Sequence, residues 1–170
     1  ATVEGSHQQQ LWEIPNFDLD YGVCENIQLN LETSFNILKQ AGQGPIAGPG
    51  SASAAVKWRF LDQERVGLDL STYPRFEWNL APSSARRGLT EDGTRFFLPV
   101  EIARSFGPIN LDLEAGPLIR SVGRSEWNYG VVIGAAATST LNLMAELHGT
   151  ARTNFAHDRL TVNVGLRKEL

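Results

Sequence analysis

VGLDLSTYPRFEWNL, residues 66–80, decides the fold class, because apolar and polar side chains alternate along it. A period of two residues places apolar side chains on one face of a β-strand and polar side chains on the other. The apolar face carries Val66, Leu68, Leu70, Phe76, Trp78 and Leu80. Strands of soluble proteins typically have about five or six residues. This stretch therefore predicts an unusually long strand with one apolar face.

The same alternation recurs in eight further segments: 16–23, 27–37, 52–60, 95–102, 109–114, 127–135, 141–148 and 160–167. With residues 66–80 counted as the fourth of nine segments along the chain, short connections follow the first, third, fifth and seventh segments. They lie at 24–26, 62–65, 107–108 and 138–140. Longer ones follow the second, fourth, sixth and eighth, at 41–51, 81–94, 120–126 and 149–158. This alternation is typical of outer-membrane barrels, with tight periplasmic turns and longer external loops. We therefore predict an all-β fold, an antiparallel up-and-down transmembrane β-barrel formed by a single domain over residues 1–170.

The polarity of the two faces suggests that the apolar face points outward. Aromatic side chains near strand ends resemble the girdles at membrane interfaces: Tyr21, Trp58, Trp78, Trp127 and Tyr129. The other face carries charges of both signs, which a narrow barrel interior would pair. The predicted lumen-facing residues are Glu32, Lys57, Arg59, Asp69, Arg75, Glu77, Arg95, Glu101, Asp112, Glu114, Glu146, His148 and Arg167. A soluble β-barrel binding protein with a solvated polar face is the alternative.

Composition excludes several classes of protein. No run approaches the ~18 to 20 apolar residues that a membrane-spanning helix needs. The net charge of −4 comes without a cluster of Lys and Arg, so no nucleic acid is expected as a partner. The single cysteine, Cys24, forms no internal disulfide, and no spacing among it and the three histidines matches a metal site.

The strand count is odd, whereas bacterial single-chain barrels have an even number of strands. We therefore expect one more strand, either before residue 1 or formed with the first ten residues. The complete barrel is then expected to hold ten to twelve strands.

Several short motifs, in order along the chain, resemble the outer-membrane transporter-like proteins named after the MetA pathway of phenol degradation. They are IPNFDLDYGVCENIQLNLE (14–32), AAVKWRFLDQE (54–64), RRGL (86–89), FFLPVEIARSFGPINLDLEAG (96–116), SEWNYGVVIG (125–134), LMAELHG (143–149) and VNVGLRKEL (162–170). The resemblance implies an outer-membrane barrel involved in the passage of small, aromatic compounds. The chain departs from outer-membrane barrels in ending on Glu169 and Leu170 instead of an aromatic residue.

Enzymatic chemistry has weak support in the sequence. Glu146 and His148 share one strand face, but no serine signature accompanies them, so a hydrogen-bonding pair in the lumen is the preferred interpretation over a catalytic one. Arg86 and Arg87 lie in the longest loop, where they are expected to be solvated or to bind lipopolysaccharide phosphates. No catalytic residue, cofactor or metal is predicted.

These observations predict a porin-like protein of the Gram-negative outer membrane, a narrow channel or transporter-like barrel for small solutes. The competing hypothesis is a structural or interaction barrel with a plugged lumen, whose loops bind a protein partner or another copy of the chain. A lipid-modifying enzyme is a third hypothesis. The expected partners are outer-membrane lipids and lipopolysaccharide, a small solute, and a protein partner or a second copy.

Overall fold

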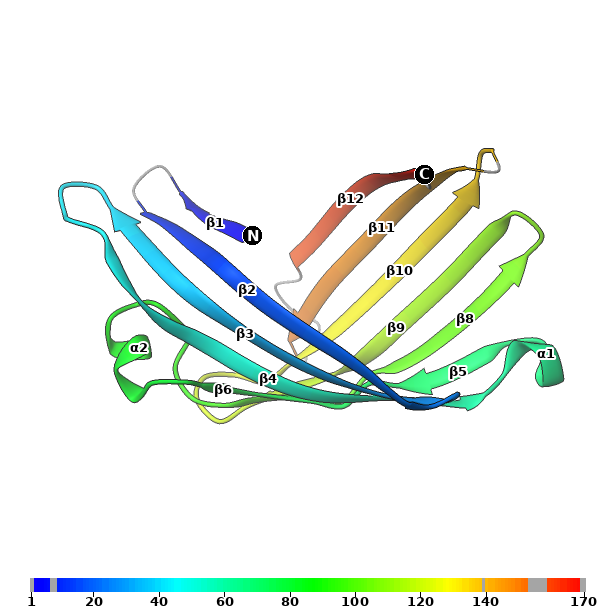
Figure 1. The fold of residues 1–170 in the computed structure, drawn as a ribbon, viewed down its shortest axis with the longest axis horizontal. Coiled ribbons are helices and arrows are strands. Elements are labelled where there is room, and N and C mark those ends of the chain that lie inside the picture. Colours follow the sequence, from blue (N-terminus) through cyan, green and yellow to red (C-terminus); the bar gives the residue numbers. More distant parts are fainter. Residues whose placement is uncertain (1, 7–8, 139, 153–158, 169–170) are drawn as a thin grey trace. The chain divides into compact units, whose positions relative to one another are not determined.

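The chain folds into an antiparallel β-sheet in the computed structural model, which describes residues 2–6, 9–138, 140–152 and 159–168 (Figure 1). Strands account for 72% of the residues and helices for 6%, so the all-β prediction is confirmed. The sheet order is β1-β2-β3-β4-β5-β8-β9-β10-β11-β12, with β6 beside β4 and β7. The chain divides into two compact units, and β4 contributes residues to both.

Unit 1 comprises residues 1–56, 75–96 and 120–123. It contains β1 (Thr2–Ser6), β2 (Gln9–Cys24), β3 (Ile27–Gln40), the first part of β4 (Ile46–Leu61), β6 (Arg75–Asn79), the short helix α2 (Pro82–Arg86) and the start of β7 (Arg95–Phe97). Strands β2 and β3 form a long hairpin in which Cys24 pairs with Ile27, as the predicted short connection requires.

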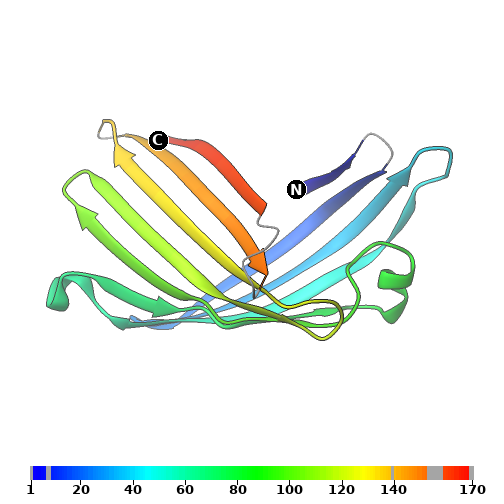
Figure 2. The same cartoon turned by 180° about the vertical axis from the view of Figure 1, so that it is seen from behind.

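Unit 2 comprises residues 57–74, 97–119 and 124–170. It contains the end of β4, helix α1 (Gln63–Val66), β5 (Asp69–Thr72), β8 (Val100–Phe106), β9 (Ile109–Arg120), β10 (Glu126–Ala136), β11 (Leu141–Arg152) and β12 (Arg159–Lys168). Strands β8 to β12 lie side by side in chain order (Figure 2). Each is antiparallel to the next.

The long strand predicted over residues 66–80 is interrupted. It begins at Asp69, because Val66 belongs to helix α1, and it breaks at Tyr73 and Pro74. Proline has no backbone N–H to donate to a strand ladder. The register is unchanged across the break, since β4 pairs Trp58 with Thr72 and Ala55 with Arg75. The segment predicted over 95–102 likewise breaks at Leu98 and Pro99, between β7 and β8.

One other segment differs from the sequence prediction, and another agrees with one of its two alternatives. Strand β4 begins at Ile46, so half of the loop expected over 41–51 is extended chain. Strand β1 pairs with the beginning of β2, so the first ten residues contribute a further strand, as one of the two alternatives expected, although they show no apolar alternation. Backbone pairing forms both segments, and backbone hydrogen bonds leave no periodic signature in a sequence.

Burial follows the alternation in an unusual sense. Large apolar side chains are exposed along the strands: Phe17 is 63% exposed, Tyr21 65% and Val164 83%. The buried hydrophobic residues are few among the described ones: Leu38, Ala52, Ala55, Leu89, Phe97, Leu118 and Ala151. Buried polar residues accompany them: Asn30, Asn36, Ser53, Ser71 and Ser84. The polar face is therefore the more protected of the two.

Candidate functional site

A polar cavity of about 430 Å³ lies in unit 1 on strands β2, β3, β4 and β6. Three carboxylates, one guanidinium, one amide and four hydroxyl groups line it, and none of these residues carries an aromatic ring: Glu13, Asn16, Glu32, Thr33, Ser34, Ser51, Ser53, Arg75 and Glu77. Three of the predicted lumen-facing residues, Glu32, Arg75 and Glu77, therefore meet at one cavity. It is the candidate site for a small polar ligand.

Antiparallel register brings the lining together. Asn16 pairs with Ser34 across β2 and β3, and Ser53 pairs with Glu77 across β4 and β6. A bulge in β2 adds Glu13, because Glu13 pairs with Asn36 while Asn16 pairs with Ser34, which leaves one more residue on β2 than on β3. One extra residue in β2 shifts the alternation of its side chains by one position, so two side chains that are three residues apart can face the same side of the sheet. Residues 13 and 16 can thus both reach the polar face.

The polar groups of the cavity are unequally satisfied. Asn16 donates a hydrogen bond from Nδ2 to Oε1 of Glu32 at 2.9 Å, and Glu77 forms an ion pair with Arg95. The side chain of Ser53 is 6% exposed, and its buried Oγ has no hydrogen-bond partner among the described residues. Unsatisfied polar groups are rare in folded proteins. The Ser53 hydroxyl is therefore a buried polar group without a partner among the described residues, and its oxygen is closed to solvent in the cavity.

The connection between β6 and β7, residues 80–94, folds back against β3 and β4, and we call it the folded-back loop. Ser84 donates from Oγ to the Pro49 carbonyl and Arg87 donates from Nη2 to the Ala47 carbonyl, both at 2.7 Å. Asn36 donates to the carbonyl of Leu89, also at 2.7 Å, and the Leu89 side chain is fully buried. Arg86 and Arg87 are exposed, as the sequence predicted, whereas Ser84 and Leu89 of the same loop are buried, which the sequence did not indicate. Burial of the apolar Leu89 side chain favours this packed position of the loop.

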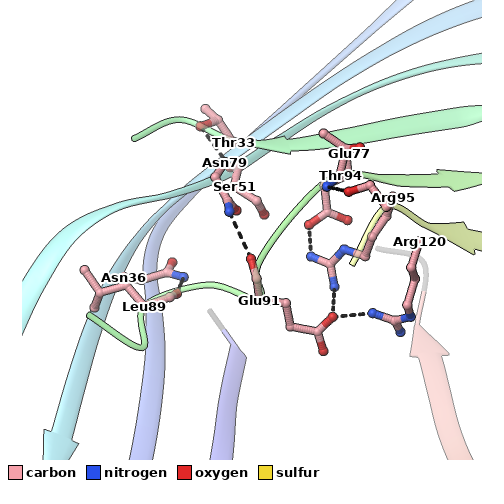
Figure 3. Close-up of polar contacts among 11 residues, drawn as sticks. Thr33, Asn36, Ser51, Glu77, Asn79, Leu89, Glu91, Thr94, Arg95 and Arg120 are labelled. Carbon is pink, nitrogen blue, oxygen red and sulfur yellow. Dashed lines mark hydrogen bonds and ion pairs between the residues drawn. The ribbon is translucent and has the colours of Figure 1, made fainter. Parts of the chain in front are cut away.

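Glu91 fastens the end of the folded-back loop (Figure 3). Its carboxylate forms ion pairs with Arg95 at 2.9 Å and with Arg120. Its carbonyl accepts a hydrogen bond from Asn79 at 2.9 Å, and Ser121 accepts one from the backbone N–H of Thr94 at 2.7 Å. We call Glu91, Arg95 and Arg120 the latch. It links the loop to the base of β7 and the end of β9.

A second group of charges lies on the polar face of unit 2. Lys57 of β4 forms an ion pair with Glu101 of β8 at 2.8 Å, and Ser71 of the intervening strand donates to the same carboxylate at 3.1 Å. Arg59 lies 3.7 Å from Asp69. Asp112 interacts with Glu101, Lys57 and Glu114. These contacts agree with the expectation that charges on this face pair between strands.

The remaining predicted lumen-facing residues lie on β11 and β12. Glu146 accepts a hydrogen bond from Asn163 at 3.1 Å, and His148 pairs in register with Thr161. All of the predicted lumen-facing residues except Arg167 are at least partly buried. These residues therefore lie on the more protected face of the sheet, but the alternation did not indicate which of them share the cavity.

The five predicted girdle aromatics lie on the apolar face. Tyr21, Trp58 and Trp127 are exposed, whereas Trp78 and Tyr129 are partly covered. Trp78 stacks on Phe76 with ring centroids 5.9 Å apart. Tyr129 lies opposite Gly149 in the register, and a Cβ at Gly149 would collide with its ring.

Sequence reasoning missed most of the cavity and the latch. Glu13 falls outside the first predicted strand, and the serines and threonines gave no signal because hydroxyls are common in strands and loops alike. Glu91 and Arg120 lay in predicted loops, where charged residues are usually solvated. The sequence shows Glu91 four residues before Arg95, but only the fold brings Arg120 beside these two residues.

Among the described residues, no group of three or more His, Cys, Asp and Glu side chains is arranged to hold a metal ion. His7 and His157 lie outside the described residues. No described helix has the length and hydropathy needed to cross a membrane. Neither the models of known protein families nor the curated proteins include a match to this chain.

Proposed function

We propose that the chain is an outer-membrane β-barrel that allows slow passage of small hydrophilic solutes through a narrow polar lumen. The observation that carries this proposal is the inverted burial, in which apolar strand faces are exposed and polar faces are protected. Leu19 is 62% exposed and Val162 67%, whereas Asn30 is 7% exposed and Asn36 is 2% exposed. Large contiguous apolar surface facing water is unfavourable, and a bilayer would cover it.

The exposed apolar area favours a lipid environment over a solvated one. Covering one large aliphatic or aromatic side chain is worth about 1.5 to 3 kcal/mol. Such side chains repeat at every second position on neighbouring strands, for example Leu29 and Leu31 beside Tyr21 and Leu19. Strands with this outward pattern are typical of barrels that cross the outer membrane. The resemblance to the transporter-like family supports the same location.

The ion pairs and the folded-back loop on the polar face support the proposal of a narrow lumen. Ion pairs such as Lys57–Glu101 and the folded-back loop occupy space that a wide pore would leave to water. Barrels of about ten strands have little room beyond side chains and a few waters. The folded-back loop also favours the competing hypothesis, a plugged barrel that uses its other loops to bind a partner.

Fractionation tests the membrane location. The protein, expressed with an outer-membrane signal peptide, should remain with the membrane after a high-salt wash and leave it only in detergent. Release by salt alone would favour a soluble or peripheral protein and refute the proposal.

Planar-bilayer recording tests the passage. Folded protein inserted into a bilayer should give a small ion current that increases when Glu91 is changed to Gln, because this change releases the latch. Absence of current from both forms would reject the channel in favour of the plugged barrel.

The lipid-modifying hypothesis fails if His148→Ala leaves every lipid product unchanged.

A further inference from the structure

Two arginine side chains of the latch converge on one carboxylate oxygen (Figure 3). Oε2 of Glu91 accepts a hydrogen bond from Nη1 of Arg95 at 2.9 Å and another from Nη1 of Arg120. The second terminal nitrogen of Arg95 donates to Glu77, which lines the polar cavity. The fork of N–H groups on a guanidinium matches the spacing of carboxylate and phosphate oxygens. The two arginines are therefore arranged to hold an anion, and Glu91 supplies that anion.

The side chains of the latch differ in exposure. Arg95 is 24% exposed and Arg120 is 20% exposed, whereas Glu91 is 60% exposed. The two guanidinium groups are thus partly protected, while the carboxylate that they share belongs to an exposed residue of the loop. Ion pairs of exposed side chains are worth about 0 to 1 kcal/mol each. A dissolved anion can therefore displace Glu91 at a small cost in free energy.

The arginine pair lies beside the protected face of the sheet. Arg95 donates to Glu77, and Glu77 pairs in register with Ser53 of β4. Phe76, the neighbour of Glu77 along the strand, is 45% exposed on the opposite, apolar face. A phosphate on a lipid head group would approach with the lipid at the apolar face. A dissolved anion on the polar face therefore matches this position better than a lipid does.

We propose that Arg95 and Arg120 bind a small phosphate-bearing solute, and that Glu91 is an internal competitor for the same site. A phosphate group carries three acceptor oxygens, so it receives N–H groups from both guanidinium groups at once. Its binding displaces the Glu91 carboxylate and releases the end of the folded-back loop. The inference rests on the proposed function only in taking the ligand to be a solute of the lumen.

Glycerol phosphate and glycerol provide a matched pair of probes, since they differ only in the phosphate group. Binding to folded protein in detergent is measured by calorimetry near pH 8 and at constant ionic strength, because the second pKa of a phosphate ester is about 6. A short tether gives Glu91 an effective concentration in the millimolar range, so the apparent Kd for glycerol phosphate should be about 1 to 10 mM. Glycerol should not bind. Binding of lipopolysaccharide in place of glycerol phosphate would overturn the assignment to a solute.

Two variants of the latch should change binding in opposite directions. Glu91→Gln removes the competing charge and should tighten glycerol phosphate binding at least threefold. Arg120→Gln removes one of the two guanidinium groups and should weaken the binding at least fivefold. Arg104→Gln, in unit 2, is the control and should bind as the unmodified protein does, because Arg104 lies over the ring of Phe106. A latch with a purely structural role predicts no such opposition, since both variants break the same ion pair. Equal affinity in the Glu91 and Arg120 variants would overturn the inference.

Tryptic cleavage after Arg86 and Arg87 reports whether the ligand releases the loop. Glycerol phosphate should accelerate this cleavage several-fold in the unmodified protein. It should add nothing in Glu91→Gln, where the competitor is already gone. Equal acceleration by sodium chloride at the same ionic strength would mean that screening alone opens the latch, and it would overturn the inference. Absence of any acceleration would also overturn it.

Binding and passage are measured separately, so their failures are distinguishable. Glycerol phosphate binding without any bilayer current leaves this inference standing and removes the proposed passage. Current that persists with no glycerol phosphate binding leaves the passage standing and removes this inference.

Discussion

Gly50 shows at the scale of one residue why a strand of this sheet needs a position without a side chain. A Cβ built on Gly50 would lie 2.9 Å from the carbonyl oxygen of Ser34 and closer still to the Ser34 hydroxyl. Real Cβ atoms do not approach backbone oxygens this closely, so Gly50→Ala must push β4 away from β3. The expected loss is about 1 to 3 kcal/mol of unfolding free energy, as for other overpacked sites.

The matched control for that change is Gly44→Ala, because no atom lies within 4 Å of a Cβ built there. Urea unfolding of protein folded in detergent compares the two. Equal midpoints for Gly50→Ala and Gly44→Ala would show that β3 and β4 are not in close contact at Gly50.

Lys57 illustrates what a charge does on the protected face. Replacing it with Met leaves Glu101, whose side chain is 15% exposed, with Ser71 as a donor and Asp112 nearby. A carboxylate that loses its cation while partly buried should reduce the unfolding free energy by about 1 to 3 kcal/mol. Adding Glu101→Gln to Lys57→Met should recover most of this loss in a double-mutant cycle, since the second change removes the unpaired charge. Additive losses in the cycle would mean that the two side chains do not interact.

The folded-back loop is the element whose behaviour the structure predicts most directly. Glu91→Gln weakens both ion pairs of the latch while keeping the Asn79 bond to the backbone. Because the Glu91 side chain is 60% exposed, global stability should change by less than about 1 kcal/mol. Local opening should increase instead, so trypsin should cleave after Arg86 and Arg87 several times faster.

Glu64→Gln is the control for this experiment, since Glu64 lies in α1 of unit 2 and contributes no side-chain bond to the loop. Its cleavage rate should equal that of the unmodified protein. If Glu91→Gln is cleaved no faster than Glu64→Gln, then Leu89 and Ser84 hold the loop without help from the latch.

Elements also differ in how well the sequence predicts them. Alternation of side chains reports which face of a strand is covered, and it therefore located the strands of residues 27–37 and 141–148 within a few residues. Alternation cannot report backbone pairing where neither face of the strand is patterned, which is why the first residues of β4 were missed. The strand β1 was expected only from the odd number of strands, as one of two alternatives. Alternation also continues across Pro74 and Pro99, where the strands break, because a proline removes a backbone hydrogen-bond donor without changing the alternation of side chains.

The cavity marks the limit of sequence reasoning for the site. Glu32, Arg75 and Glu77 were identifiable as polar-face residues, since each alternates with an apolar neighbour. Their meeting point depends on register and on the bulge before Asn16, neither of which the composition of the strands determines. Arg120 joined Glu91 for the same reason, across 29 residues of chain.

At the scale of the whole molecule, the two faces of one strand offer a direct test of the membrane proposal. Ile133 is 48% exposed on the apolar face of β10, and Val132 lies on the other face, opposite Asp112 of β9 and Glu146 of β11. In water, an exposed isoleucine tolerates lysine with little change in stability. In a bilayer, a lysine near the midplane destabilises a barrel by about 2 to 4 kcal/mol.

Ile133→Lys should therefore reduce folding into lipid vesicles by at least tenfold, whereas Val132→Lys should fold well because two carboxylates face the new ammonium group. Folding yield in vesicles, read from resistance to protease, measures both variants. Equal yields would mean that the apolar face does not contact lipid, and the exposed strand faces would then need another covering.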